Sequence, residues 1–238
     1  MEDNSIKECV RVIGFGRETK ALLEEIGKFG KESIELFDAQ DGKVTESTQD
    51  LKMVILLATE NSDDLRNIAS KFFKADVPTF GIFTINNADF ESFTDAYTTV
   101  PASEMTSTVK ALIYPAFNCG MINLDLDDII NTLYGKKHFH VVSARAKGED
   151  RVALAISAIA GSLPDKLRNG IENLTLVLYY NPSAQPEFNV KEIEPIQQLI
   201  STLPGETDTV WAVYHEPTLT DGSIRICAIA AGKDIFIA

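Results

Sequence analysis

Apolar residues in the first hundred positions of the chain follow two different spacings. Short runs rich in Val, Ile, Leu and Phe have the length of strands, whereas apolar residues three or four positions apart form one buried face of a helix. Helical spacing follows the first run, and it returns after Asn61 and Ser62, either of which could cap a helix. The runs occupy 10–13, 33–38, 53–58, 78–84 and 96–100. Strands that alternate with helices in this way predict a parallel, Rossmann-like sheet.

The rest of the chain has a different order of elements. Two helices come first, one over 103–117 that Pro115 disturbs late and one capped by Asn123 or Asp125, with Asp127 and Asp128 in its first turn. Further strands are expected at 139–144, 174–180, 209–215 and 223–231, with helices after Gly148 and Val190. The last two strands, joined by a turn at 220–222, are expected to pair as a hairpin.

These patterns predict an α/β protein with a mostly parallel, Rossmann-like sheet domain, a central helix and a smaller α+β domain. The boundaries expected are 1–101 for a reduced nucleotide-binding-like domain, 102–119 for the central helix and 120–238 for the α+β domain. Helices in the last domain would cover a four-stranded sheet.

Charge narrows the classes of partner. The 238 residues carry 22 Lys and Arg against 35 Asp and Glu, a net charge of −13. This balance argues against binding to nucleic acid or to an anionic membrane, because both require a basic surface. No apolar run approaches the ~20 residues of a membrane span, and the chain starts with acidic rather than apolar residues. A cytoplasmic protein is expected.

Cysteine and histidine offer little chemistry. Cys9, Cys119 and Cys227 are far apart and without a C-x-x-C pair, which is typical of reduced thiols. His138 and His140 would share one face of a strand, but no third ligand is placed nearby. No metal site is expected.

The turn after the first strand is one candidate ligand site. Gly14-Phe15-Gly16 would let a ligand approach the backbone, and Asp38 follows at the distance of a ribose-binding acid. However, Thr19 occupies the third glycine position of the dinucleotide fingerprint, and Arg17 and Glu18 crowd the turn. A dinucleotide or other small-ligand site and a plain tight turn are both compatible with these residues.

The loop after the third strand argues against a polyphosphate. Residues 58–64 contain no glycine, and Glu60, Asp63 and Asp64 stand at a helix N-terminus, where a phosphate would otherwise be attracted. We expect this loop to repel such a ligand.

Four segments of the second half resemble the FtsZ/tubulin superfamily. Gly120-Met-Ile-Asn-Leu-Asp-Leu-Asp-Asp-Ile129 is similar to its G-x-[IM]-N-x-D-x-x-D-[IV] segment, and Gly148-Glu-Asp-Arg151 is similar to the G-E-D-R that follows in bacterial FtsZ. Residues 171–181 and 224–232 are similar to later strands of its second domain. Order and spacing agree over residues 102–232.

The resemblance implies a role for three polar residues. In that family this loop reaches across a longitudinal contact into the nucleotide pocket of the next subunit, where its acids help to position the water that hydrolyses GTP. Asn123, Asp125 and Asp128 fall on those positions. Carboxylates can orient a water in this way when a neighbour supplies the phosphate.

The first half departs from the family in its phosphate loops. The family's G-x-G-G-G-G-x-N is here Gly14-Phe-Gly-Arg-Glu-Thr-Lys-Ala21, and its G-G-G-T-G-[ST]-G is replaced by Thr59–Asp64. The stretch that holds the guanine ring is largely missing between Val100 and Ala111. We therefore expect no cofactor, with GTP in a remodelled pocket as the alternative.

The resulting hypothesis is a cytoskeletal or cell-division-related pseudo-GTPase that acts through longitudinal contacts with FtsZ or with itself, as a cap or regulator of filaments. The alternatives are a divergent GTPase and a dinucleotide or small-ligand binder that uses Gly14, Gly16 and Asp38.

Overall fold

The computed structural model describes residues 9–29, 33–42, 44, 47–163 and 170–233. The acidic N-terminal residues lie outside this part of the chain. The chain forms two compact units, one of residues 1–110 with 133–137 and one of residues 111–132 with 138–238. Each unit is described by itself.

The first unit contains a parallel sheet, as the alternating pattern predicts. Its strands are β1 (Cys9–Phe15), β2 (Ile34–Asp38), β3 (Leu51–Ala58), β4 (Thr79–Phe83) and β5 (Ala96–Thr99). They pair in the order β2-β1-β3-β4-β5, each parallel to its neighbours. The six residues from Met53 to Ala58 are all buried, as expected for a strand covered on both faces.

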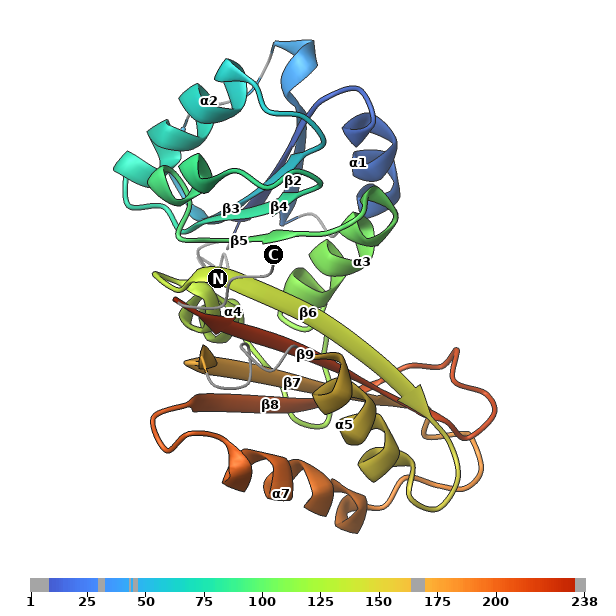
Figure 1. Ribbon diagram of the computed structural model, residues 1–238. Helices are drawn as coiled ribbons and strands as arrows, with labels where there is room; N and C mark the ends of the chain where they lie inside the picture. The colour runs from blue at the N-terminus through green and yellow to red at the C-terminus, as the bar shows by residue number, and fades with distance from the viewer. Residues whose placement is uncertain (1–8, 30–32, 43, 45–46, 164–169, 234–238) are drawn as a thin grey trace, which may run out of the picture. The chain divides into compact units, whose positions relative to one another are not determined.

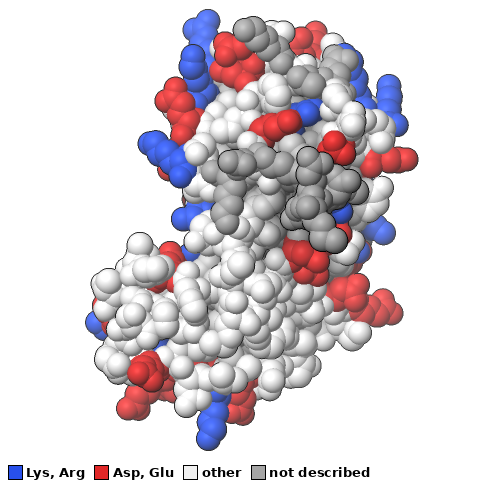
Figure 2. All heavy atoms as spheres, turned by 180° about the vertical axis from the view of Figure 1, so that it is seen from behind, with Lys and Arg blue, Asp and Glu red and all other residues white. Residues whose placement is uncertain are grey.

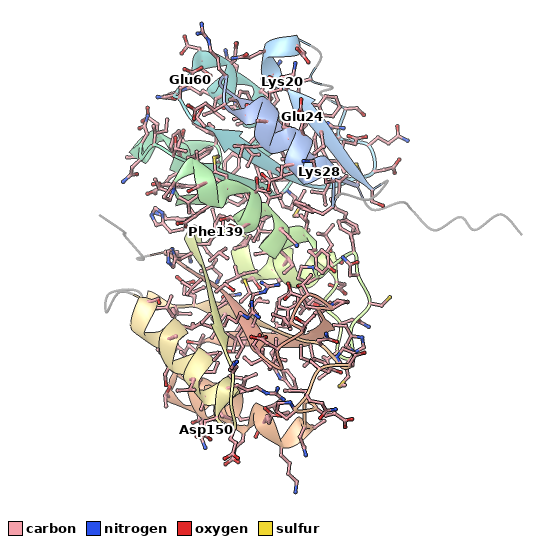
Figure 3. All side chains as sticks on the ribbon, turned by 90° about the vertical axis from the view of Figure 1, so that its right-hand side faces the viewer. Lys20, Glu24, Lys28, Glu60, Phe139 and Asp150 are labelled. Atoms are coloured by element: carbon pink, nitrogen blue, oxygen red, sulfur yellow. The ribbon has the colours of Figure 1, made fainter. Side chains whose placement is uncertain are left out.

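Two helices cover this sheet. They are α1 (Thr19–Gly27) and α2 (Asp63–Lys74), accompanied by short 3₁₀ turns η1 (Ala39–Asp41) and η2 (Ala88–Ser92). The chain moves in one direction across the sheet from β1 through α1 to β2, and in the opposite direction from β3 through α2 to β4. Because both crossovers are right-handed, α1 and α2 lie on opposite faces of the sheet (Figure 1). Lys20 and Glu24 lie along the outer side of α1, and Lys28 follows directly after the helix (Figure 3).

Helices α3 (Ala102–Ile113) and α4 (Leu126–Leu133) follow. Met105, Val109, Leu112 and Ile113 of α3 are buried, in agreement with the predicted inward face. The helix ends at Ile113, earlier than expected, because Pro115 cannot donate a backbone hydrogen bond and its ring crowds the preceding turn.

The second unit contains a four-stranded sheet of mixed direction. Its strands are β6 (Lys137–Ala146), β7 (Asn173–Tyr180), β8 (Asp208–His215) and β9 (Ile224–Gly232). They pair in the order β6-β9-β7-β8, with β7 and β8 parallel and β9 antiparallel to both of its neighbours. Helices α5 (Arg151–Ser162) and α7 (Glu194–Thr202), the latter preceded by the 3₁₀ turn η3 (Val190–Ile193), pack on one face.

The predicted hairpin between the last two strands is wrong. β9 is inserted between β6 and β7, whereas β8 pairs with the far side of β7. Burial explains the difference, because β9 is covered along nearly its whole length and needs the centre of the sheet, while β8 is only half-buried in its first half. The turn at Asp221-Gly222 reverses the chain without making its two flanking strands partners.

Candidate functional site

The carboxyl edge of the first sheet brings together two of the predicted ligand residues. Gly14 of β1 is the register partner of Asp38 of β2, and Gly16 comes directly after β1. The neighbouring loop after β3 closes against them, since the Thr59 amide donates to the Phe15 carbonyl oxygen over 3.3 Å. This is the edge at which a Rossmann-like sheet holds its ligand.

The two glycines of this turn make room for the chain's own side chains. A Cβ atom on Gly14 would lie 2.7 Å from Thr19 Oγ1, and one on Gly16 would lie 2.5 Å from Thr59 Oγ1 and 3.2 Å from Glu60 Cγ. Gly16 also has a φ of +105°, which side-chain-bearing residues rarely adopt. Thr19 Oγ1 donates to the Gly16 carbonyl oxygen over 2.7 Å, so a threonine fills the side of the turn where the third glycine would stand.

Asp38 has a local structural role at the same edge. Its Oδ1 accepts a hydrogen bond of 2.9 Å from the Gln40 amide and so caps η1. A side chain that caps the turn beside it is the ordinary behaviour of aspartate. The structure thus places Asp38 beside Gly14 and gives its carboxylate a partner within the chain.

The N-terminus of α2 is supplied with negative charge by its own residues. Ser62 Oγ accepts a hydrogen bond of 3.2 Å from the Leu65 amide, which confirms Ser62 as the cap. Asp63 and Asp64 occupy the first turn, and Glu60 is exposed just before it (Figure 3). An anionic ligand would therefore meet three carboxylates at the helix end that would otherwise attract it.

The acidic loop of the second unit is pinned to the end of β8. The Met121 amide donates to the Val213 carbonyl oxygen over 2.8 Å, and the Val213 amide donates to Ile122 over 3.1 Å. A Cβ atom on Gly120 would overlap the Val213 carbonyl oxygen, so only glycine permits this close approach. Asn123 Oδ1 accepts from the Gly120 amide over 2.6 Å and closes the loop.

Asp125 and Asp128 cap α4 reciprocally. Asp125 Oδ1 accepts from the Asp128 amide over 2.8 Å, and Asp128 Oδ2 accepts from the Asp125 amide over 2.9 Å. This arrangement satisfies two amides at the helix N-terminus and settles the expected cap in favour of Asp125. Asp125 is exposed, Asp128 is half-buried, and the second oxygen of each accepts no hydrogen bond from the described residues. Those oxygens are available to a water.

Tyr214 holds this loop from beneath, and sequence inspection does not reveal it. Its hydroxyl donates to the Pro115 carbonyl oxygen over 2.8 Å and accepts from the Leu124 amide over 2.8 Å. Burial raises the pKa of Tyr214, and this exceeds the opposing effect of the Leu124 hydrogen bond, so the hydroxyl keeps the proton it donates. The loop therefore rests on a fixed hydroxyl of β8.

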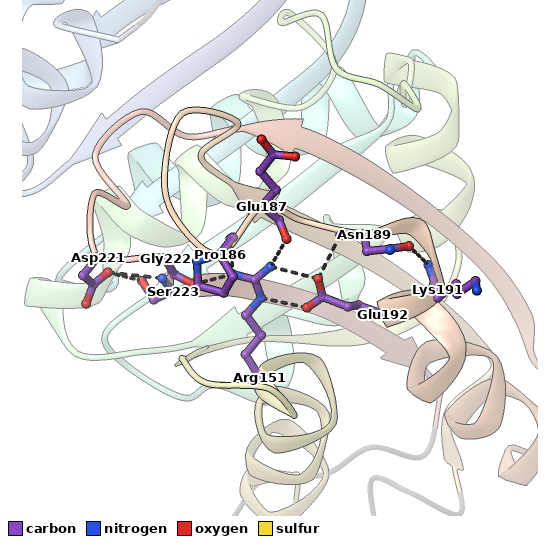
Figure 4. Close-up of polar contacts among 9 residues, drawn as sticks. All are labelled: Arg151, Pro186, Glu187, Asn189, Lys191, Glu192, Asp221, Gly222 and Ser223. Carbon is purple, nitrogen blue, oxygen red and sulfur yellow. Dashed lines mark hydrogen bonds and ion pairs between the residues drawn. The ribbon is translucent and has the colours of Figure 1, made fainter.

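Arg151 has a structural role that the G-E-D-R motif alone did not indicate. Only 2% of this residue is exposed, and its guanidinium contacts both carboxylate oxygens of Glu192, with Nε to Oε2 at 2.7 Å and Nη2 to Oε1 at 2.9 Å (Figure 4). It also donates to the carbonyl oxygens of Pro186, Gly222 and Glu187 over 3.1, 2.5 and 3.1 Å. All five donors of the guanidinium are used within the chain, so Arg151 joins two loops and the 3₁₀ turn η3 and has no donor left for a ligand.

The remaining predictions concern metal and surface charge. Among the described residues no group of three His, Cys, Asp or Glu side chains could hold a metal ion, and no helix there is long and apolar enough to cross a membrane. On the face seen in Figure 2 the described Lys and Arg side chains stand among Asp and Glu. The exclusion of nucleic acid stays a prediction from the net charge.

Comparison with known proteins relates the fold to solved structures. No family model and no curated protein matches the sequence. Among solved structures, an FtsZ dimer from M. jannaschii described as empty aligns with a TM-score of 0.74 at 14% identity, over 94% of this chain and 88% of that one. CetZ2 from Haloferax volcanii, a GTPγS-bound protofilament, aligns with 0.59 at 14% identity, over 94% and 93%.

TubZ from Bacillus thuringiensis serovar israelensis, in GDP-form protofilaments, aligns with a TM-score of 0.66 at 9% identity, over 95% of this chain and 89% of that one. The chain has an FtsZ/tubulin-like fold. This confirms the fold expected from the motifs, and the alignments extend over the first half of the chain as well as the second. At such low identity the likeness concerns the fold, and residue roles must come from the site itself.

Proposed function

We propose that this FtsZ/tubulin-like protein has no GTP site of its own and acts through filament-type longitudinal contacts. In this proposal the loop Asn123–Asp128 docks on the nucleotide-holding face of a GTP-bound FtsZ subunit, or of a related filament protein. In this proposal the first unit offers no nucleotide pocket to a following subunit. The protein would then act as a cap or regulator of filaments in a cytoskeletal or cell-division process.

The filled first turn is the observation that carries the proposal. Gly14 and Gly16 are accounted for by the contacts with Thr19, Thr59 and Glu60, which leave no need for a phosphate beside them. A polyphosphate at this edge would meet a turn already packed against its own side chains and would approach Asp63 and Asp64 at the start of α2. Both effects disfavour binding, one by packing and one by charge.

The acidic loop supports the contact half of the proposal. Its backbone is fixed by Val213 and Tyr214, and one oxygen each of Asp125 and Asp128 accepts no hydrogen bond from the described residues. Two solved neighbours of this fold are protofilaments, one with GTPγS and one in the GDP form. We infer that a pre-shaped loop of this kind fits a subunit that supplies the nucleotide, where the carboxylates would orient a water.

Co-sedimentation with the FtsZ of the source organism tests the proposal. Full-length protein is added to FtsZ with GTP, and pelleted polymer and phosphate release are measured. The variant carrying Asp125→Asn and Asp128→Asn is informative, because asparagine oxygens still cap the helix while the charges are lost. Asp127→Asn is the matched control, since it removes one charge from the same turn. We expect the wild type and the control to change polymer mass or GTPase rate, and the double variant to do so less.

Unchanged polymer and GTPase rate, with no association, would refute the contact proposal. Calorimetry of the protein alone with GTP tests the other half. Micromolar binding would favour a divergent GTPase that holds GTP in a remodelled pocket. The adjacency of Gly14 and Asp38 supports the small-ligand alternative instead. The same titration with an adenine dinucleotide covers the small-ligand alternative, in which tight binding would also raise the melting temperature.

A further inference from the structure

Among the described residues, none pairs with the outer edge of β8 over the first half of this strand. β8 is the last strand of the four-stranded sheet of the second unit (Figure 1). The backbone N–H and C=O groups of its even-numbered residues point toward β7. This follows because the Asp208 amide donates to the Glu172 carbonyl oxygen and the Glu216 amide donates to the Tyr180 carbonyl oxygen. Val213 faces outward and is paired with Ile122. The direction of these backbone groups alternates from one residue of a strand to the next, so the N–H and C=O groups of Thr209 and Trp211 also point away from β7.

No described residue pairs with these outward groups. Thr209 and Trp211 make no backbone hydrogen bond outside the sheet among the described residues, and Thr209 Oγ1 is buried without a partner there. The edge also lacks the usual protection, because Thr209-Val-Trp-Ala-Val213 contains no proline, lysine or other charge. Such a strand is a template for a further strand.

We propose that this edge pairs with the same edge of a second copy of the chain, in an antiparallel arrangement with Val210 on the twofold axis. In this register Thr209 lies opposite Trp211 of the other copy, and Trp211 lies opposite its Thr209. Each such pair exchanges two backbone hydrogen bonds. A register centred on Trp211 forms only one such pair, because Val213 is already occupied by Ile122. A register centred on Thr209 also forms only one, because the Thr207 amide already donates to the Pro204 carbonyl oxygen.

Side chains and charge agree with this register. Thr209 and Trp211 project to the same face, on which Trp211 packs against the helix-covered core, so each aromatic ring would gain a β-branched neighbour. The charged residue Asp208 falls opposite Ala212 and not opposite itself. Two acidic chains can therefore meet at this uncharged stretch without placing carboxylates face to face.

The occupant is a second copy because the edge is self-complementary and short. Pairing adds two bonded residue pairs, which predicts a weak, concentration-dependent dimer. This pairing is independent of the proposed longitudinal contact, which uses the loop Asn123–Asp128. A head-to-tail contact leads to chains of increasing length, whereas a twofold edge contact stops at the dimer.

The variant Thr209→Pro tests the edge without breaking the sheet. The Thr209 amide faces away from β7, so proline removes an outward donor and keeps the β7–β8 ladder. Thr209→Val is the matched control, because it keeps the amide and the branched shape and loses only the unpaired hydroxyl. Sedimentation velocity of the full chain, up to several hundred micromolar, gives the mass, and circular dichroism checks folding.

We expect the wild type and Thr209→Val to approach twice the monomer mass of 26.2 kDa. Thr209→Pro should raise the dimer dissociation constant about tenfold or more, since one lost donor counts twice in a symmetric dimer. A wild type that stays monomeric, or a folded Thr209→Pro that dimerises equally well, overturns the proposal. Oligomers larger than a dimer that form equally well with Thr209→Pro also overturn the proposal.

A disulfide test fixes the register. Val210→Cys in a Cys119→Ser background places two thiols on the axis as a non-hydrogen-bonded pair, at a Cα separation of about 4.5 Å that a disulfide can span. Mild oxidation should yield a covalent dimer, and the background alone should not. Asp208→Cys in the same background is the register control. Absence of the Val210→Cys dimer, or equal yield from Asp208→Cys, rejects this register.

Discussion

Replacement of Arg151 by methionine should destabilise the second unit strongly. The substitution removes the five hydrogen bonds of the guanidinium while keeping much of its aliphatic volume. It leaves the Glu192 carboxylate with the Asn189 amide as its one donor among the described residues, and it removes the Arg151 donors from the carbonyl oxygens of Pro186, Glu187 and Gly222.

The magnitude follows from burial. Breaking a buried ion pair by removing one partner costs about 3–5 kcal/mol, because the other charge stays in place. The Glu192 side chain is 21% exposed, so water partly replaces the lost donor and the lower end of that range, about 3 kcal/mol, is expected. Arg151→Lys keeps the charge but not the planar fork, and its loss should be smaller though still measurable.

Urea denaturation followed by tryptophan fluorescence measures this loss. Trp211 is the one tryptophan of the chain and packs against the core of the second unit, so its emission reports on that unit. Arg145→Met is a suitable control, because Arg145 contacts Asp221 and Ser223 at the surface and is half-exposed. If Arg151→Met lowers the free energy of unfolding by less than about 1 kcal/mol, or by no more than the control does, the hydrogen bonds of Arg151 do not stabilise the unit and the prediction is wrong.

Three further predictions concern the same unit. Burial alone would raise the pKa of Glu192, but hydrogen bonds from Arg151 and the Asn189 amide outweigh burial and lower this pKa. The contribution of Glu192 to the free energy of unfolding should therefore be complete above the ordinary pKa of about 4.3 and decrease as the pH falls below it. In urea titrations between pH 6 and 3, Glu192→Gln should flatten this pH dependence. Tyr214→Phe leaves the Leu124 amide unpaired and the Pro115 carbonyl oxygen with only the longer bond from the Asn118 amide, and it should cost about 1–3 kcal/mol in the same assay. A neutral result would contradict the anchoring role of the hydroxyl. Gly120→Ala forces a Cβ against the Val213 carbonyl oxygen and should cost about 1–3 kcal/mol and expose Met121 and Ile122 further to proteolysis; an unchanged digestion pattern would count against the close approach.

Several features of this protein follow from local sequence. The helix at Leu126 and its acidic cap, the Ser62 cap of α2 and the apolar run from Met53 to Ala58 in β3 all match their patterns. Such features depend on residues within about one helical turn of each other or on burial of a single strand, and these interactions are visible in the sequence.

Strand partners and site roles depended on tertiary structure. β9 pairs with β6 and β7 across separations of many residues, so the nearby turn at Gly222 could not reveal its neighbours. Gly14 and Gly16 are compatible with a ligand or with packing, and only the positions of Thr19 and Thr59 distinguish the two. Arg151 likewise shows its role only when Glu192 is brought to it from η3. Contacts between distant segments are selected by the burial of the whole fold, and no local pattern records them.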